Sequence, residues 1–163
     1  MAVRAMDAET RAVRNDHGAI RLWLRLLATN RLVETRTRRL LQERFATTLP
    51  RFDLMAQLER APRGLKMGEL SRRMMVTGGS VTGITDMLED EGLVERVADP
   101  ADRRAWVVRL TPAGRRAFAA MAQEHERWII EAFAELTGRE MSLMAALLAR
   151  VKTHVRSLEG NKA

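Results

Sequence analysis

Residues 65–112 read LKMGELSRRMMVTGGSVTGITDMLEDEGLVERVADPADRRAWVVRLTP and contain two helical patterns, a glycine-containing break and two strand-like segments. Apolar residues recur at intervals of three and four from Leu65 to Met74, which predicts a short helix. Val76-Thr77-Gly78-Gly79 interrupts this pattern. A second helix is predicted to run from Gly78 to about Glu91, because the glycine that follows is a typical C-terminal helix cap.

The end of this stretch alternates between apolar and polar residues, which is typical of β-strands. Strands are predicted at Leu93–Ala98 and Ala105–Leu110, joined by the polar tip Asp99–Arg104. An isolated hairpin is only marginally stable in water, so this one must pack against the helices before it. A hairpin directly after two short helices predicts a winged helix–turn–helix lobe.

Longer helices are predicted on both sides of this lobe. Residues 17–45 have an apolar face at helical spacing, and Pro50 begins a further helix that ends before Pro62. Thr111-Pro112 is a strong helix start, and the helix that it opens is predicted to stop at Thr137-Gly138. A last helix is predicted to extend to about Leu158.

The predicted fold class is therefore mainly α with a small β-hairpin. The winged helix–turn–helix lobe is expected to comprise residues 50–111, with the long terminal helices within 17–45 and 113–158. Residues 1–16 are expected to be a flexible N-terminal segment, and 159–163 a short tail.

Composition narrows the function. The chain has 163 residues, with 28 Lys and Arg against 21 Asp and Glu, a net charge of +7 and a pI near 11.2. This positive balance favours a polyanionic partner, most often nucleic acid. No cysteine is present, which excludes disulfides, cysteine zinc sites and thiolate nucleophiles. No secretory signal is evident, and the most apolar stretch, 22–28, is short and contains Arg25, so we expect a cytoplasmic protein that does not span a membrane.

No catalytic motif is evident, so we expect no enzyme activity, no catalytic residue, no metal site and no cofactor. The segment Gly78–Gly83 lacks the lysine that a phosphate-binding loop needs.

The second helix of the lobe presents a small, polar face. Gly79, Thr82, Gly83 and Asp86 fall on one side of it, opposite Val81, Ile84 and Leu88, while Ser80 and Thr85 flank the polar side. A glycine inside a helix costs roughly 1 kcal/mol relative to alanine, so Gly83 needs a reason. Close approach to the edges of bases in a DNA major groove is one, and close helix packing in an ordinary core is the alternative.

This helix carries no Lys or Arg, so phosphate contacts must come from its neighbours. Arg72 and Arg73 precede it, and Arg103 and Arg104 lie at the hairpin tip, where arginine suits insertion into a minor groove. Asp102 is placed to brace Arg104, although a solvated turn explains the same residues. The predicted DNA-contacting residues are Ser71, Arg72, Arg73, Thr77, Gly79, Ser80, Thr82, Gly83, Thr85, Asp86, Asp102, Arg103 and Arg104.

The segments Leu65–Met74 and Val81–Leu93, together with Asp102-Arg103-Arg104 running into Leu110-Thr111-Pro112-Ala113-Gly114, resemble the MarR family of bacterial transcriptional regulators. The resemblance implies a homodimer that binds double-stranded DNA at a pseudo-palindromic operator. It further implies that helix 78–91 enters the major groove, that Arg104 reaches the minor groove, and that the terminal helices form the dimer. The main alternative is an architectural DNA-binding protein without sequence preference, because helix 78–91 has few side chains that read bases.

Members of this family commonly bind small aromatic anions, and residues 49–58 and 70–79 are similar to the branch that responds to hydroxycinnamates or their CoA thioesters. The candidate ligand-binding residues are Trp23, Arg38, Arg39, Phe52, His125 and Trp128. For the tryptophans, plain core or dimer packing is the alternative; for His125, an exposed helix position; for the arginines, a solvated face paired with Glu34 and Glu43. The absence of cysteine removes peroxide sensing, and the scattered histidines argue against zinc sensing.

Overall fold

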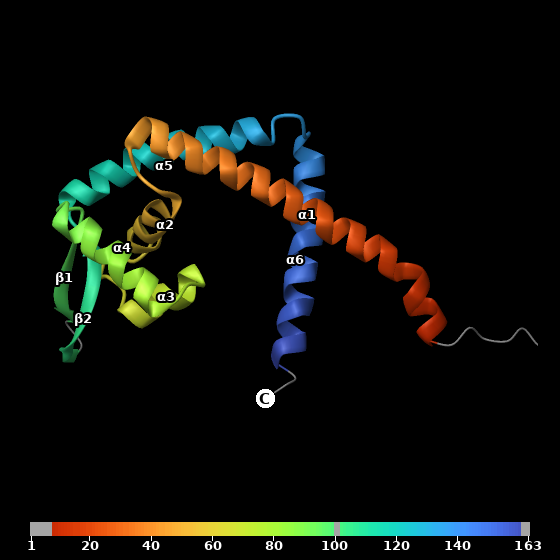
Figure 1. Ribbon diagram of the computed structural model, residues 1–163, viewed down its shortest axis with the longest axis horizontal. Coiled ribbons are helices and arrows are strands. Elements are labelled where there is room, and N and C mark those ends of the chain that lie inside the picture. Colours follow the sequence, from red (N-terminus) through yellow and green to blue (C-terminus); the bar gives the residue numbers. More distant parts are fainter. Residues whose placement is uncertain (1–7, 100–101, 161–163) are drawn as a thin grey trace, which may run out of the picture. The chain divides into compact units, whose positions relative to one another are not determined.

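A computed structural model describes the backbone of residues 8–99 and 102–160, and the side chains of residues 17–99, 106–158 and 160. The chain divides into two compact units, residues 1–125 and 126–163. The elements in chain order are α1 (Ala8–Phe45), α2 (Leu49–Glu59), α3 (Met67–Met74), α4 (Gly78–Asp90), β1 (Val94–Asp99), β2 (Asp102–Leu110), α5 (Pro112–Ala132) and α6 (Gly138–Gly160) (Figure 1). The predicted fold class, a mainly helical chain with one winged helix–turn–helix lobe, is confirmed.

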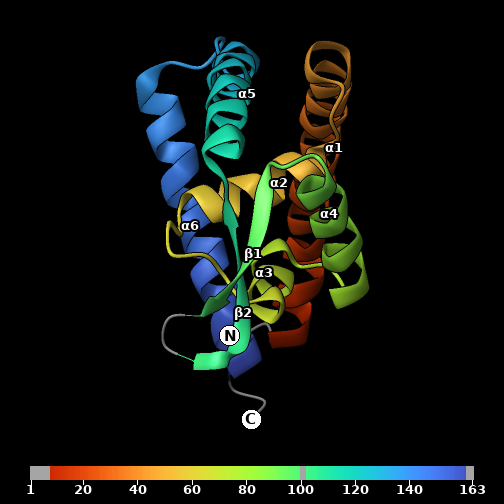
Figure 2. The same cartoon turned by 90° about the vertical axis from the view of Figure 1, so that its left-hand side faces the viewer.

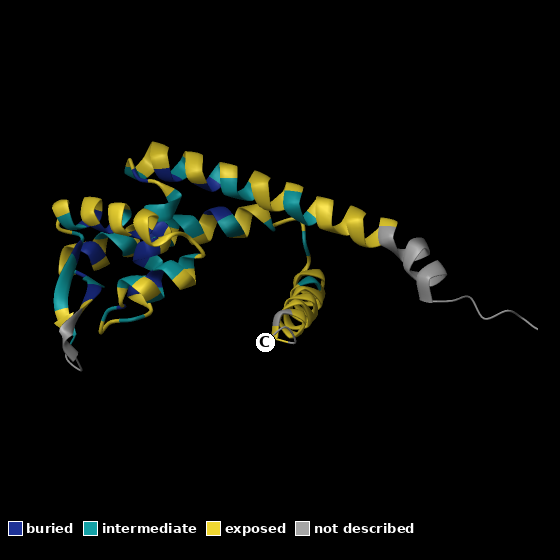
Figure 3. Ribbon diagram, turned by 60° about the horizontal axis from the view of Figure 1, so that its bottom comes forward, coloured by how far each residue is buried: buried dark blue, intermediate teal, exposed yellow. Residues whose placement is uncertain are grey.

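The core of the first unit lies between α2, α3, α4 and the hairpin. Its apolar side chains are almost completely removed from solvent, and Figure 3 shows them as the dark blue segments of these elements. The most deeply buried are Leu54, Met55, Leu58, Leu70, Val81, Leu88, Val94, Val108 and Leu110. The apolar spacing in the sequence therefore identified the buried faces of these helices correctly.

The hairpin is antiparallel, with Val94 opposite Leu110 and Ala98 opposite Trp106 (Figure 2). A third segment joins it, because the backbone N–H groups of Leu65 and Val108 each donate to the other residue's carbonyl at 2.9 Å. Leu65, predicted as helical, is thus part of the sheet edge, and α3 begins at Met67. A single bridging residue has no periodic pattern, which is why the sequence did not reveal it.

Thr111 and Gly114 fix the junction between the hairpin and α5. The Thr111 hydroxyl accepts from the backbone N–H of Gly114 at 3.0 Å and donates to the carbonyl of Gly92 at 2.7 Å. A Cβ atom on Gly114 would overlap the carbonyl oxygen of Leu93, so only glycine fits there. The Leu-Thr-x-x-Gly sequence is therefore a requirement of this junction.

Three predicted boundaries were wrong. Helix α1 begins at Ala8, so part of the segment expected to be flexible is helical, because extending a formed helix is much easier than starting one. Strand β2 begins at Asp102, which shortens the predicted tip. Helix α5 ends at Ala132 instead of Thr137, and a turn follows in which the N–H groups of Ala134 and Leu136 donate to the carbonyls of Glu131 and Phe133. A capping box of Thr137 and Glu140 then starts α6.

In the second unit, α6 leaves its apolar side chains exposed. They recur at helical spacing, and each is between 40% and 60% exposed in this single chain: Met141, Leu143, Leu147, Leu148, Val151, Val155 and Leu158.

Candidate nucleic-acid interface

Helix α4 has one buried and one exposed face. Val81, Thr85 and Leu88 are fully buried, whereas Ser80, Thr82, Gly83 and Asp86 are exposed. These exposed residues are small and polar, as the sequence predicted, and Met87 of α4 is also 49% exposed. No part of the described chain covers this face, so the helix could enter a DNA groove with it.

The turn before α4 is held by short polar side chains. Met75 adopts a left-handed conformation with φ of 54°, and its N–H bonds back to the carbonyl of Arg72 at 3.3 Å. The Ser71 hydroxyl donates to the carbonyl of Val76 at 2.6 Å. Thr77 is the N-cap of α4 and accepts from the N–H of Ser80 at 3.3 Å. Ser71 and Thr77, both predicted DNA contacts, thus also set the angle at which α4 leaves α3.

Gly83 is not explained by packing within the chain. A Cβ atom built at Gly83, or at Gly79, meets nothing within 4 Å. The alternative that Gly83 permits close helix packing in the core is therefore wrong for this chain. The glycine keeps the exposed face of α4 flat, with the Thr82 hydroxyl donating to the carbonyl of Gly78 at 3.0 Å beside it.

Thr85 was wrongly predicted as a DNA contact. Its side chain is fully buried, and its hydroxyl donates to the carbonyl of Val81 at 2.8 Å. Residues four apart lie on the same helix face, so Thr85 follows Val81 into the core, and the hydroxyl is satisfied within its own helix. Its polar residue type misled the prediction.

Arg96 of β1 ties the exposed face of α4 to the hairpin. Its guanidinium donates to the carboxylates of Asp86 and Glu89, and its backbone N–H donates to Glu89 at 3.0 Å. These bonds raise the pKa of Arg96, with the bond to Asp86 as the largest cause. Asp86, predicted to face DNA, therefore lies on the exposed face of α4 and forms an ion pair with Arg96. Sequence reasoning missed Arg96, because its partners come from another element.

The remaining basic residues are placed unevenly. Arg72 is exposed, and Arg73, one residue on, pairs with Glu69 on α3 at 2.5 Å. The backbone of Asp102–Arg104 belongs to β2, but the side chains of these three residues lie outside the described part of the chain. Their predicted contacts with DNA stay predictions.

The predicted ligand-binding residues are only partly brought together. The rings of Phe52 and His125 lie with their centroids 4.8 Å apart, and Phe118 lies 5.4 Å from Phe52. Burial lowers the pKa of His125. His125 is half-buried, not at the exposed helix position given as its alternative.

The remaining candidates, two arginines and two tryptophans, differ in pairing and exposure. Arg38 and Arg39 pair on exposed α1 with Glu34 and Glu43, as their alternative interpretation expected. Trp23 is 61% exposed, whereas Trp128 is 4% exposed and belongs to the second unit.

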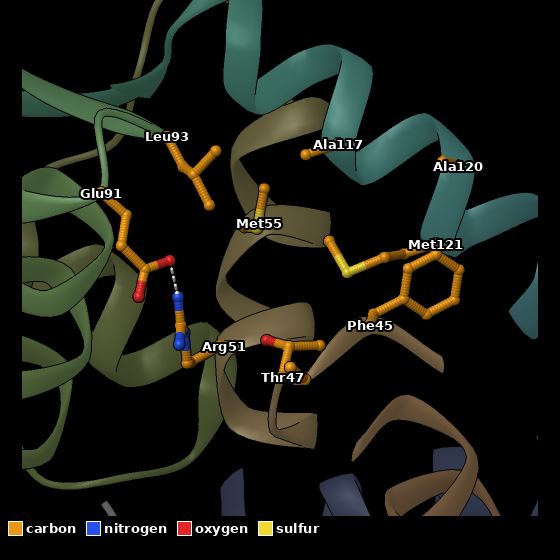
Figure 4. A pocket seen from close by; sticks show the side chains of 10 residues that line it. Phe45, Thr47, Arg51, Met55, Glu91, Leu93, Ala117, Ala120 and Met121 are labelled. Atoms are coloured by element: carbon orange, nitrogen blue, oxygen red, sulfur yellow. Dashed lines mark hydrogen bonds and ion pairs between the residues drawn. The ribbon is translucent and has the colours of Figure 1, made fainter. Parts of the chain in front are cut away.

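A cavity of about 430 Å³ lies beside Arg51 (Figure 4). Most of its wall is apolar, and its lining residues are Phe45, Ala46, Thr47, Arg51, Met55, Glu91, Leu93, Ala117, Ala120 and Met121. The Arg51 side chain is 14% exposed and donates to the Glu91 carboxylate from one end of its guanidinium. Its Nε atom is buried and has no hydrogen-bond partner in the part of the chain that the structure describes. An arginine on a largely apolar helix is the one local sign of this cavity in the sequence.

Among the described residues, no group of three His, Cys, Asp or Glu side chains could hold a metal ion. None of the helices in that part of the chain is long and apolar enough to cross a membrane.

The chain is similar to known transcriptional regulators. A sequence profile of the MarR family matches residues 47–106. The crystal structure of a MarR family transcriptional regulator from Silicibacter pomeroyi is 30% identical in sequence, with a TM-score of 0.74, over 86% of this chain and 97% of that one. The chain spans just under two thirds of the length of the first curated relatives that it matches, at 66%, 63% and 64%.

Similar structures have been solved with bound partners. A mutant MarR from E. coli complexed with operator DNA is 25% identical, with a TM-score of 0.71, over 84% of this chain and 96% of that one. CouR from Rhodococcus jostii RHA1, bound to p-coumaroyl-CoA, is 19% identical with a TM-score of 0.71, over 80% of this chain and 90% of that one. The second likeness shows a shared fold.

Proposed function

Because the chain belongs to the MarR family, whose members are transcriptional regulators and not enzymes, we propose that it is a ligand-responsive repressor that binds a pseudo-palindromic operator as a homodimer. The observation that carries this proposal is the exposed face of α4, where the position of Gly83, beside Thr82, borders open space. A helix that is flat and polar on its outer face fits the major groove, which is about 12 Å wide.

In this proposal α4 reads base edges, and its neighbours hold the phosphates. Arg72 supplies a phosphate contact from α3, and Arg104 supplies the minor-groove contact from the hairpin. Arg96 contributes indirectly, because it fixes Asp86 and Glu89 and so sets the angle between α4 and the hairpin. The net charge of +7 supports association with a polyanion.

The homodimer is supported by the apolar faces of the terminal helices. Trp23 and Leu24 of α1 and Leu147 and Val151 of α6 are all about half exposed in a single chain. Large apolar side chains that stay exposed along a helix mark an interaction site. A two-fold axis would place the two α4 helices about 34 Å apart, on half-sites one turn of B-DNA apart.

The proposed effector is an aromatic acid or its CoA thioester, of the hydroxycinnamoyl type. The aromatic cluster of Phe52, Phe118 and His125 and the cavity beside Arg51 support an aromatic anion. That CouR binds p-coumaroyl-CoA is a precedent on the same fold. The effector would release DNA by binding more tightly to a conformation whose α4 helices no longer match the operator.

An architectural DNA-binding protein without sequence preference is the second candidate, because Asp86 on α4 is already held by Arg96. The two functions differ in measurable affinity. A repressor should prefer its selected duplex over random DNA by roughly 10³ or more, whereas an architectural protein should show little preference and a steep salt dependence.

The test of the proposal is Gly83→Ala, measured on a duplex that the wild-type protein selects from a random library. The new methyl group meets no atom of the chain, so it should stabilise α4 by up to about 1 kcal/mol, while its bulk at the DNA surface should weaken operator binding. Gly83→Leu should abolish operator binding with the dimer mass unchanged, and Arg104→Ala should weaken it more than tenfold.

Gly18→Ala is the matched control. Gly18 is also a helical glycine in open space, so the substitution should raise stability without changing the affinity for DNA. A Gly83→Leu protein that retains full operator affinity would refute the placement of α4 in the groove.

A further inference from the structure

We propose that α4 selects thymine, through the methyl group that this base presents in the major groove, and that Thr82 and Met87 make the contact. This inference rests on the proposed function and names the base that the helix recognises. Of the four standard bases, thymine alone carries a methyl group there. The hydrogen bonds and the exposure of the side chains on the outer face of α4 lead to this base.

Helix α4 carries few of the side chains that read bases by hydrogen bonds. Its sequence, GGSVTGITDMLED, contains no Lys, Arg, Asn or Gln. Lysine and arginine pair with guanine in the major groove, and asparagine and glutamine pair with adenine. Between Gly78 and Met87, the exposed polar side chains are those of Ser80, Thr82 and Asp86. Any hydrogen-bonded readout by this part of α4 therefore depends on these three.

All three polar side chains are already bonded within the chain. The Thr82 hydroxyl donates to a carbonyl one turn back in α4 at 3.0 Å, and the Ser80 hydroxyl lies 2.9 Å from that of Thr77. The Asp86 carboxylate accepts from the Arg96 guanidinium. Exchanging one of these bonds for a bond to a base gains little net free energy. Hydrogen bonds from α4 are thus a weak source of sequence preference.

The outer face of α4 also presents apolar groups. Because the Thr82 hydroxyl is turned back to the helix backbone, its methyl group is the part of the side chain left for a partner. Met87 is 49% exposed, whereas Val81 and Leu88 have no exposed surface. At about 100° per residue, Gly83 falls between Thr82 and Met87 on the helix circumference, and a Cβ atom there meets nothing within 4 Å. A methyl group in the groove can therefore contact both side chains and approach the backbone between them.

Contacts of this kind discriminate by the methyl group of the base. Thymine and uracil pair with adenine in the same way and differ only at C5, where thymine carries the methyl group. Burial of one CH₂-sized group is worth about 0.8 kcal/mol, which is about fourfold in affinity. An unbranched thioether adapts its shape to the surface against it, which suits Met87 to this contact. Each half-site should therefore contain thymine opposite Thr82 and Met87.

Two other contacts use the same side chains. Thr82 and Met87 can pack against the sugars of the DNA backbone, or the Thr82 oxygen can accept from the amino group of adenine or cytosine. Neither contact involves the thymine methyl group. Removal of that group therefore separates both alternatives from the proposal.

The experiment uses the full-length protein and a duplex that it selects from a random library. Each thymine in turn is replaced by deoxyuridine, which removes one methyl group and leaves the base pairing unchanged. The affinity is measured at one fixed salt concentration, because phosphate contacts depend strongly on salt. The wild type should lose about fourfold at one or more thymines of each half-site and nothing at thymines outside the contact.

Substitutions at Thr82 separate its methyl group from its hydroxyl. Thr82→Ser keeps the hydroxyl and loses the methyl group, so it should bind the thymine and uracil duplexes equally at the position that it contacts. Thr82→Val keeps a methyl group and loses the hydroxyl, and it should retain the fourfold preference. Met87→Ala should lose the preference at its own thymine, and Met87→Leu should retain it. Thr153→Ser on exposed α6 is the matched control and should respond as the wild type does.

The proposal is overturned if the half-sites of the selected duplex contain no thymine or if no deoxyuridine weakens binding. It is also overturned if either Thr82→Ser or Met87→Ala keeps every penalty of the wild type. The proposed repressor function fails on a different result, a wild-type protein that selects no duplex from the library. That result would overturn the readout of thymine as well, whereas a selected duplex that is insensitive to deoxyuridine overturns the readout alone.

Discussion

The winged lobe, residues 49–110, and helix α6 place their apolar side chains in opposite ways. In the lobe, Leu54, Leu70 and Leu88 have no exposed surface, whereas Leu147 and Val151 of α6 are 47% and 53% exposed. Both sets follow the helical spacing of three and four, so the pattern alone does not distinguish them. The difference shows that the lobe completes its core within one chain and that α6 requires another surface.

This contrast means that the lobe and α6 contribute to different quantities, the lobe to the stability of one chain and α6 to the association of chains. The burial of apolar area contributes roughly 25 cal/mol per Å², and the lobe gains this in the isolated chain. Helix α6 gains it only when a second surface covers it. Changes in the lobe should therefore alter the free energy of unfolding, and changes on α6 should alter the association of chains.

The largest expected effect comes from placing charge on the exposed apolar face of α6. Leu147→Asp combined with Val151→Asp should dissociate the proposed dimer, because carboxylates are costly to bury at an interface. Sedimentation should then give the mass of one 18.5 kDa chain, and operator affinity should fall by roughly a hundredfold or more, since each half-site would be bound separately.

Arg156→Asp, on the opposite side of α6, is the control, and it should leave the mass unchanged. A double variant that still sediments as a dimer would show that this face of α6 does not form the interface.

The next largest effect compares the loss of stability when one leucine of the lobe and one leucine of α6 are each replaced by alanine. Leu88→Ala in the lobe should lower the free energy of unfolding by about 2–5 kcal/mol at every protein concentration, because it leaves a cavity in a closed core. Leu147→Ala should lower it only under conditions in which the wild type is associated. Chemical denaturation at several protein concentrations distinguishes the two, and an equal, concentration-independent loss for Leu147→Ala would remove the contrast.

The sequence predicted the lobe well because most of its determinants are local. The buried positions Leu70, Val81 and Leu88 followed from spacing, and the helix start at Thr111 followed from its hydroxyl and the proline after it. Thr85 was misassigned, because residue type was weighed above its place four residues after Val81.

What the sequence could not show depends on partners far away in the chain. Arg96 forms an ion pair with Asp86, Arg51 forms one with Glu91, and Leu65 forms a β-bridge with Val108. No local sequence pattern predicts any of these pairs. Arg38 and Arg39, two of the candidate ligand residues, instead pair one turn away on α1, with Glu34 and Glu43.

The smallest effect concerns His125, whose ring packs against Phe52 of the lobe. Burial lowers the pKa of His125 in the folded chain below its usual value of 6.5. Between the pKa of His125 in the folded chain and its pKa in the unfolded chain, the unfolded chain binds more protons than the folded one. The free energy of unfolding therefore rises with pH in this range. Stability should accordingly fall as the pH is lowered from 7.5 through 6.5.

The slope cannot exceed about 1.4 kcal/mol for each pH unit, and it should stay well below that limit because solvent screens the half-buried ring. Thermal unfolding at pH 7.5 and 5.5 measures the loss. His125→Gln should reduce it, because the amide does not titrate, whereas His154→Gln on exposed α6 should leave the loss as it is in the wild type. If both variants keep the full pH dependence, the desolvated ring beside Phe52 is not its source. The closed core of the lobe would then not extend to His125 of α5.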